Sequence, residues 1–271
     1  MTHASEVNAL VLAGARASGD PLCIAEGVKS KAIIEIAGAP MLSHVMQSLT
    51  QAGLPNPIWI LGGQEENLAS AAGGVRFQNL PATGSGPAGS LANALAQDLK
   101  VPLLVTTADH PLLTTDMIIH FLHHAQQNGA DICIGFARRD TIAAAYPDTR
   151  RTYLPIGERD LSGCNLFYLA TDKAAHVLEF WRTVEQHRKH PWRIARRLGL
   201  GFLIRLFLHR RRTDIVFDLL SKQLGASVSP IILPFAEAAI DVDSPSDLSL
   251  VREIMENRAS KPKNSTQAGV S

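Results

Sequence analysis

The sequence predicts an α/β protein with a mostly parallel β-sheet. Short apolar runs alternate along the chain with segments of helical periodicity, which is the pattern of strand–helix–strand units. The 271 residues suffice for one large α/β domain or two small ones, and 46% hydrophobic with 19% charged residues is an ordinary globular composition. The clearest predicted strands are residues 9–12, 57–61, 103–107 and 131–136, and the predicted helices between them are residues 40–51, 86–98 and 114–128.

The second half of the chain begins with a long helical stretch. From residue 171 to 224 the pattern is helical throughout, with breaks at Pro191 and near Gly199 and Gly201, so we predict a helical insertion at about 171–225. Strands are predicted to resume at 227–233 and 239–242. A closing helix then begins with Pro245 in its first turn and runs to about residue 256. We therefore expect a single domain over residues 1–258.

Charge and cysteine usage limit the kind of protein this is. The formal net charge of +1 gives no support to a nucleic-acid partner. Cys23, Cys133 and Cys164 are far apart and form no CxxC pair, which argues against a zinc site or a disulfide framework and fits a reducing compartment. No leader and no membrane-length apolar run is present, so we expect a cytoplasmic protein. Residues 259–271 are polar and are predicted to be a disordered tail.

Small and basic residues follow the first predicted strand. The strand runs into Leu12-Ala13-Gly14-Ala15-Arg16, and Lys29 and Lys31 come after a gap. Small residues let the backbone approach a ligand and turn its N–H groups toward phosphate. Arg16 and Lys31 would add the cationic charge that a triphosphate requires. The alternative is a plain strand–helix turn with basic residues on the surface. A GxGxxG dinucleotide fingerprint is absent from the chain, which disfavours an NAD(P)-dependent oxidoreductase.

Two acidic segments are candidates for metal binding. Asp109 follows the buried run 103–107 and Pro111 ends that strand, so its carboxylate is expected at the sheet rim where α/β proteins bind ligands. Asp241 lies in the predicted strand 239–242 and Asp243 directly follows it, two residues apart, so both side chains are expected on the same face. Two carboxylates on one face repel each other unless a cation lies near them. Carboxylates are typical ligands of Mg²⁺ beside phosphates. Capping of the following helix is the alternative for Asp109, and capping of the last helix is the alternative for one or both of Asp241 and Asp243, where Asp243 or Ser244 would serve as the cap.

Two further segments are weaker signals on their own. Gly84, Ser85 and Ser90 precede or begin a predicted helix, and their N–H and hydroxyl groups are candidates for reading a base or ribose. Gly163 and Asn165 place a small residue and an amide at the start of an apolar strand. Ordinary turn chemistry would explain either segment.

These pieces, in this order, resemble the nucleotidyltransferase superfamily, and within it the MobA-like NTP transferases. The opening Leu12-Ala13-Gly14-Ala15-Arg16 with Lys31 is similar to the family's LAGG-x-G-x-R…K motif, with Ala15 in place of the second glycine and a long loop over residues 17–30. The segment 240–248 is similar to the late V-[DN]-x-P-x-D-L motif. The resemblance covers about residues 8–257 apart from most of the helical insertion, and it implies a three-layer α/β/α, Rossmann-like fold of the glycosyltransferase-A type.

The resemblance also implies roles for individual residues. It assigns Mg²⁺ to Asp109 and Asp243, phosphate neutralisation to Lys31 and Arg16, and the acceptor side to Gly163 and Asn165. The residues it assigns to nucleotide binding are Leu12, Ala13, Gly14, Ala15, Gly84, Ser85, Ser90 and Asp109.

The implied reaction transfers a nucleoside monophosphate from an NTP to a phosphate-bearing small molecule. A phosphate oxygen of the acceptor would attack the α-phosphorus in line, and pyrophosphate would leave. A non-catalytic nucleotide-binding or regulatory protein on the same fold is the alternative, suggested by the altered glycine loop. The sequence indicates neither the base nor the acceptor, nor an oligomeric state.

Two other signals have simpler interpretations. His120, His123 and His124 have the spacing of a metal pair on a helix, but no HExxH motif is present, and we interpret them as a solvated helix face. Residues 192–212 mix arginines with large apolar residues. We interpret this stretch as a subdomain that packs its apolar side on the core; contact with an anionic membrane surface is the less favoured interpretation.

Overall fold

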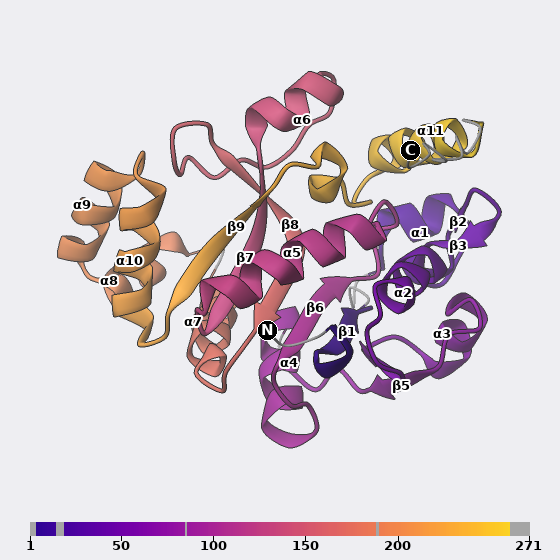
Figure 1. Cartoon of the computed structure of the whole chain (residues 1–271), viewed down its shortest axis with the longest axis horizontal. Coiled ribbons are helices and arrows are strands. Elements are labelled where there is room, and N and C mark those ends of the chain that lie inside the picture. The colour runs from indigo at the N-terminus through magenta and orange to yellow at the C-terminus, as the bar shows by residue number, and fades with distance from the viewer. Residues whose placement is uncertain (1–3, 15–18, 85, 188–189, 261–271) are drawn as a thin grey trace, which may run out of the picture.

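The computed structural model describes residues 4–14, 19–84, 86–187 and 190–260. The chain forms a seven-stranded sheet in the order β5-β4-β1-β6-β8-β7-β9 (Figure 1). Strand β8 is antiparallel to both of its neighbours, and every other pair is parallel. The prediction of a mostly parallel α/β sheet is confirmed. In spatial order the strands are β5 Phe77–Leu80, β4 Ile58–Leu61, β1 Asn8–Leu12, β6 Leu103–Thr107, β8 Leu161–Leu169, β7 Ile132–Arg138 and β9 Val228–Leu233.

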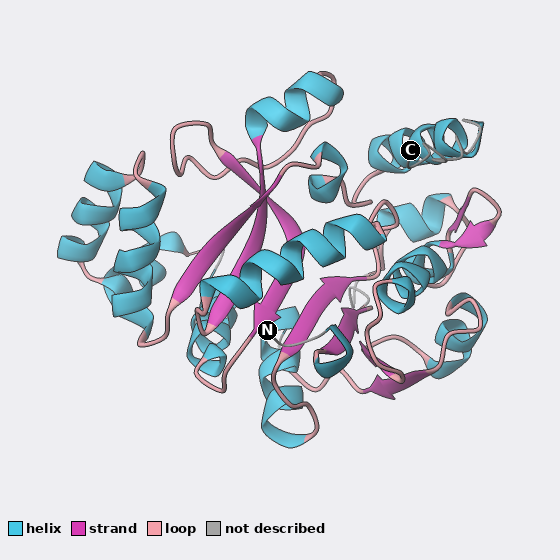
Figure 2. Ribbon diagram, viewed as in Figure 1, coloured by secondary structure: helices cyan, strands magenta, loops and turns pink. Residues whose placement is uncertain are grey.

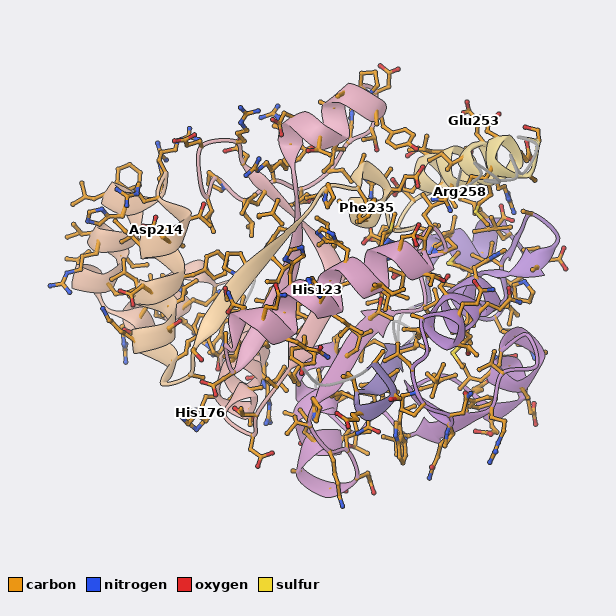
Figure 3. All side chains as sticks on the ribbon, in the orientation of Figure 1. His123, His176, Asp214, Phe235, Glu253 and Arg258 are labelled. Carbon is orange, nitrogen blue, oxygen red and sulfur yellow. The ribbon has the colours of Figure 1, made fainter. Side chains whose placement is uncertain are left out.

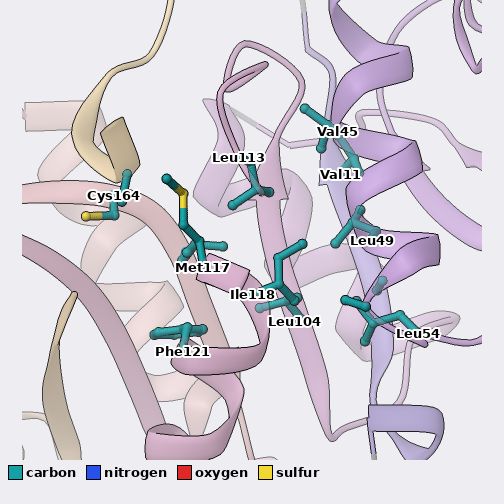
Figure 4. Packing of buried hydrophobic residues seen from close by; sticks show 14 of the residues in the cluster. Val11, Val45, Leu49, Leu54, Leu104, Leu113, Met117, Ile118, Phe121 and Cys164 are labelled. Carbon is teal, nitrogen blue, oxygen red and sulfur yellow. The ribbon is translucent and has the colours of Figure 1, made fainter. Parts of the chain in front are cut away.

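Helices cover both faces of this sheet, because the strands alternate between two apolar faces (Figure 2). In β1, Val11 packs into one buried cluster and Leu10 into the other. The first cluster lies under helices α2 Met41–Gln51, α3 Glu65–Ala71 and α5 Thr115–Asn128, and Figure 4 shows residues of β1, α2 and α5 packed in it. The second lies under α4 Gly86–Gln97, α7 Ala174–His187 and α10 Thr213–Leu224. The chain therefore has three layers.

A third buried cluster closes the sheet edge at which the parallel strands end. It joins α1 Pro21–Ala25, the small sheet of β2 Glu35–Ile36 with β3 Ala39–Pro40, and the closing helix α11 Pro245–Ser260. The predicted tail beyond Ser260 lies outside the described residues. The other short helices of the described residues are the 3-10 helices η1 Ala4–Glu6, η2 Lys31–Ile33 and η3 Ala236–Ala239, and the α-helix α6 Arg139–Ala145.

The predicted helical stretch folds as α7, α8 Pro191–Leu198, α9 Leu200–His209 and α10. Its predicted breaks fall between these helices, and Gly199 adopts a positive φ of 83° between α8 and α9. Helices α8, α9 and α10 lie together at one end of the molecule, at the left of Figure 1. None of the helices in the described part of the chain combines the length and the apolar run that crossing a bilayer requires.

The predicted strand over residues 239–242 is wrong. Ala239 ends η3, and residues 240–243 have no regular structure. Ile240 and Val242 are fully buried and alternate with Asp241, which imitates the pattern of a half-buried strand. The segment lies instead beside the loop that follows β6, where the Val242 amide donates to the carbonyl oxygen of Asp109 at 2.8 Å.

Candidate active site

Main-chain hydrogen bonds bring three loops together at the edge where β1 and β6 end. The Ala108 amide donates to the Leu12 carbonyl oxygen at 3.0 Å, which fixes the loop after β6 beside the end of β1. The bond from Val242 to Asp109 then fixes residues 240–243 beside that loop. The side chains of Asp109 and Asp243, distant in sequence, are therefore held in one small region.

Lys31 lies at the centre of this region. Its Nζ is 2.8 Å from Asp243 Oδ1, 3.8 Å from Asp109 Oδ2 and 3.6 Å from Asp20 Oδ2, and it also donates to the Val242 carbonyl oxygen at 2.9 Å. Burial acts to lower the pKa of Lys31, but the hydrogen bond to Asp243 and the charges of the nearby carboxylates outweigh it, and the pKa is raised. Lys31 is therefore a fixed cation among three acidic groups.

Local structure explains how Lys31 reaches this position. It begins the 3-10 helix η2, whose cap is the Ser30 hydroxyl accepting from the Ala32 amide at 3.3 Å. Lys29, two residues earlier in the chain, is exposed. Asp20 caps α1 through the Leu22 amide at 2.9 Å and turns its second oxygen toward Lys31. The structure thus groups Lys31 with Asp109 and Asp243.

Asp109 has an unusual environment for a carboxylate. Its Oδ1 is buried and has no hydrogen-bond partner among the described residues. Burial raises the pKa of Asp109 to about 6. The Thr107 hydroxyl and Lys31 act against burial, and the charges of Asp241 and Asp243 act with it. An acidic oxygen with an unused lone pair beside a fixed ammonium is suited to bind a further cation.

Asp241 lies in the same acidic environment, where burial and the charge of Asp243 raise its pKa, but unlike Asp109 it has close hydrogen-bond partners. Its carboxylate accepts from Arg151 Nη1 at 2.9 Å and from Asn165 Nδ2 at 3.0 Å, and Arg151 also pairs with Asp247. Because the charge of Asp243 acts with burial to raise the pKa of Asp241, the expected repulsion is present, and only the strand that was to place both carboxylates on one face is wrong. No strand forms there, and each carboxylate turns to a different cation, Arg151 or Lys31.

The acceptor-side candidates lie at the start of β8. Asn165 adopts a positive φ of 51° near an irregularity in the pairing of β7 with β8, and its amide is engaged by Asp241. Gly163 is exposed, and a Cβ placed there would meet nothing within 4 Å. The structure joins Asn165 to the acidic segment and leaves open space beside Gly163.

Small residues let the loop before α4 pack directly against the first turns of that helix. A Cβ on Gly84 would lie 2.2 Å from the carbonyl carbon of Gly89, so only glycine fits there. The Gly84 amide donates to the buried Ser90 hydroxyl at 3.1 Å, and Glu185 of α7 accepts from the Ala88 amide at 3.2 Å. Ser85 lies outside the described residues.

The loop after β1 is described only in part. Leu12 and Ala13 continue the strand to the sheet edge, where the Ala13 amide donates to the Leu61 carbonyl oxygen at 2.9 Å. Gly14 closely approaches Gly62, since a Cβ on Gly62 would lie 3.1 Å from the Gly14 Cα. The predicted phosphate residues Ala15 and Arg16 lie outside the described residues.

Sequence reasoning missed two members of this arrangement. Arg151 follows Arg150 in a segment without periodicity, so nothing in the sequence separates a buried arginine from a surface one. Asp20 carried one usable signal, because an aspartate directly before Pro21 is typical of a helix N-cap.

The residues present fit a magnesium ion shared with phosphates. Mg²⁺ usually takes one or two carboxylates and completes its shell with water and substrate phosphate oxygens. Asp109, with its unpartnered oxygen, and Asp243 provide such a pair. Among the described residues no three His, Cys, Asp or Glu side chains form a ligand cluster, so the protein does not supply a full cage in this region.

An α/β sheet with acidic and basic side chains at the ends of its parallel strands has the layout of a ligand-binding protein of the Rossmann-like type. The family model of the MobA-like NTP transferase domain matches residues 9–198. The chain belongs to this family, and the resemblance read from its motifs is confirmed.

Curated relatives agree with this assignment. The chain is 24% identical over 177 residues to a molybdenum cofactor guanylyltransferase of Shewanella amazonensis, a match covering 63% of this chain and 84% of the relative. It is 30% identical over 115 residues to the bifunctional protein GlmU of Exiguobacterium sibiricum, which covers 41% of this chain but only 25% of that longer relative.

Solved structures share the fold. A hypothetical transferase from Thermus thermophilus superposes with a TM-score of 0.74 at 29% identity, covering 89% of this chain and 99% of that one. A CMP:2-keto-3-deoxy-manno-octonic acid synthetase complexed with CTP superposes with a TM-score of 0.56 at 14% identity, covering 93% and 99% of the two chains. The second likeness shows the fold alone.

Proposed function

We propose that the chain transfers a nucleoside monophosphate from an NTP to a phosphate-bearing small molecule, with Mg²⁺, and releases pyrophosphate. The observation that carries the proposal is the convergence of Lys31, Asp109 and Asp243 beside the small-residue end of β1. Membership of the MobA-like NTP transferase family supports the reaction class.

Each group has a role that follows from its charge. Both reactants are anionic, so their repulsion is the main barrier that the site must lower. Lys31, held rigidly by its acidic neighbours, would neutralise charge on the donor phosphates, and Arg16 would assist it. Asp109 and Asp243 would hold Mg²⁺, which when bound neutralises charge on phosphate oxygens. A phosphate acceptor is already ionised at neutral pH, so the chain needs no general base.

The nucleotide and the acceptor would enter from different sides of this centre. Leu12, Ala13, Gly14 and Ala15 would present backbone to the phosphates, and Gly84, Ser85 and Ser90 would shape the base and ribose side. Gly163, with open space beside it, and Asn165 would line the acceptor side. The buried Ser90 hydroxyl contributes by holding the loop that carries Gly84.

Pyrophosphate release tests the proposal. The full chain is incubated with each of ATP, GTP, CTP and UTP and a panel of sugar 1-phosphates, alcohol phosphates and cofactor-precursor phosphates, with Mg²⁺ or with EDTA. We expect release with one base and one acceptor class, in Mg²⁺ only. Asp109→Asn should lower turnover about 100- to 1,000-fold, as loss of one key electrostatic group does.

Thermal shift separates catalysis from binding alone. A nucleotide that binds the native state raises the melting temperature. A shift with an NTP but no pyrophosphate with any acceptor would favour the non-catalytic nucleotide-binding protein. Near-normal turnover of Asp109→Asn would contradict the assignment of this carboxylate.

A further inference from the structure

The outward side of helix α9 is apolar. Leu200, Phe207 and Leu208 are 75%, 65% and 70% exposed, and Ile204 lies between them on the same stripe at the spacing of one helical turn. Trp192 of the neighbouring helix α8 is also exposed. Five of the eight large apolar side chains that the described part of the chain exposes therefore lie on these two short helices.

The other side of α9 is used for packing. Leu206 packs against the second buried cluster, and the helix lies against α8 and α10. A helix that is apolar on both sides is normally covered on both sides. The interpretation that residues 192–212 pack their apolar side on the core thus fails for the outward stripe, which no described residue buries.

The same surface carries a dense positive charge. Nine lysine and arginine residues and no acidic residue lie in the sequence between Glu185 and Asp214. Asp214, labelled in Figure 3, begins α10 at this end of the molecule and pairs with Arg212. Arg193, Arg196 and Arg205 are exposed on α8 and α9.

Charge and apolar surface are mixed here at the level of single side chains. The Arg193 guanidinium lies 5.3 Å from the Trp192 ring, and that of Arg210 lies 4.7 Å from the Phe207 ring. An arginine beside an exposed aromatic ring suits the boundary between lipid headgroups and acyl chains, where apolar side chains insert and cations meet phosphates.

We propose that α8 and α9 dock the protein on an anionic phospholipid surface. The stripe of Leu200, Ile204, Phe207 and Leu208 inserts into the interfacial layer, and the surrounding arginines contact headgroup phosphates. Charge complementarity selects this occupant, because each basic residue near an anionic leaflet adds attraction. Two copies of the chain joined through this face would instead oppose like charges.

The docking surface is linked to the candidate site through the chain. The Gly157 amide donates to the Arg210 carbonyl oxygen at 2.8 Å, and Arg211 pairs with Asp160 at 3.2 Å. Both contacts tie the turn after α9 to the segment between α6 and β8, which also contains Arg151. Docking would therefore hold this segment at a defined distance from the bilayer.

Vesicle co-sedimentation of the full chain tests the proposal. Phosphatidylcholine vesicles with and without phosphatidylglycerol are compared at low and high salt. We expect binding only with phosphatidylglycerol and a weaker interaction at high salt. The double variant Phe207→Glu/Leu208→Glu and the double variant Arg196→Glu/Arg205→Glu should each lower the vesicle partition coefficient about tenfold or more.

Ile119→Glu is the matched control, because Ile119 is an exposed apolar residue on α5, away from this surface. It should bind vesicles as the unmodified chain does, and all variants should keep the same melting temperature because the altered side chains are exposed. Equal binding to vesicles without phosphatidylglycerol would overturn the proposal. So would undiminished binding of the Phe207→Glu/Leu208→Glu variant, or light scattering that shows a dimer which this variant dissociates.

Discussion

The amide of Val242 donates a hydrogen bond to the carbonyl oxygen of Asp109, so a backbone bond, besides the contacts of Lys31, joins the two acidic segments. Asp243 follows this bond directly and reaches Lys31. Because the joining bond is independent of any carboxylate, substitutions of Asp109 or Asp243 are expected to leave the loops in place. Such variants therefore report on chemistry rather than on misfolding.

Lys31→Met should have opposite effects on turnover and on binding of a metal ion alone. Loss of the ammonium removes charge neutralisation at the donor phosphates, and turnover should fall about 100- to 1,000-fold. In the absence of nucleotide, the same change removes a cation that competes for Asp109 and Asp243, so Mn²⁺ should bind more tightly. Calorimetric titration with Mn²⁺ measures this, and weaker binding to the variant would contradict the arrangement.

Arg151→Met should destabilise the fold. The Arg151 side chain is only 6% exposed and pairs with Asp241 and Asp247, so its removal leaves partly buried carboxylates without their cation. The free energy of unfolding should fall by about 3 kcal/mol in urea denaturation. Arg139→Met is the matched control: Arg139 is exposed and pairs with Asp160, and its loss should cost less than about 1 kcal/mol. Equal effects of the two substitutions would disprove a structural role for Arg151.

His110 should make stability fall in mild acid. Burial lowers the pKa of His110 to about 4, from 6.5. Between these values the unfolded chain binds a proton that the folded chain excludes, so the free energy of unfolding falls as pH drops from about 6.5 to about 4, by roughly 3 kcal/mol in total.

Asp109 acts in the opposite direction. Its raised pKa makes the folded state bind the proton between about pH 4 and 6, which favours folding as the pH falls. His110 is therefore best measured by difference. The free energy of unfolding of His110→Gln, minus that of the unmodified chain, should rise as pH falls from 6.5 to 4, and a pH-independent difference would refute this.

Gly84→Ala should disrupt the loop before α4. The added Cβ would overlap the backbone at Gly89, so the loop must shift and its bond to Ser90 must weaken. Overpacking of this kind costs about 1–3 kcal/mol, and nucleotide affinity should fall with it. Gly163→Ala, where a Cβ meets open space, should unfold at the same temperature as the unmodified chain. Calorimetric melting of both variants checks this pair of expectations.

The sequence predicted those parts of the fold that local patterns encode. Apolar runs marked the central strands, and Pro191 and Gly199 marked the breaks in the helical stretch. The edge strand β5 was missed because Phe77–Leu80 is short and half polar. The false strand at residues 239–242 was predicted because the buried residues Ile240 and Val242 alternate with the polar Asp241, as in a strand. The segment pairs instead with the loop after β6, through the bond from the Val242 amide to the Asp109 carbonyl oxygen. Which segment a strand pairs with depends on the tertiary structure, and the periodicity of the sequence does not reveal it.

The candidate site shows the same division. Lys31, Asp109 and Asp243 could be nominated because charged residues just outside apolar runs stand out in the sequence. The pairing of Asp241 with Arg151 could not be predicted, because Arg151 comes from a remote segment of the chain. The pattern of charged residues in the sequence shows which side chains could form the site, but the tertiary packing determines which ion pairs they form.

Strand β8 runs against both neighbours, so its first residues lie at the edge where β6 and β7 end. Residues 139–160 therefore leave the sheet and return to it at the same edge, and Arg151 within them reaches Asp241. Because both ends of this segment are fixed at one edge of the sheet, the segment could be replaced as a unit. Transplanting its counterpart from a relative would exchange one wall of the proposed acceptor side while β1, β6 and the proposed donor side stay as they are.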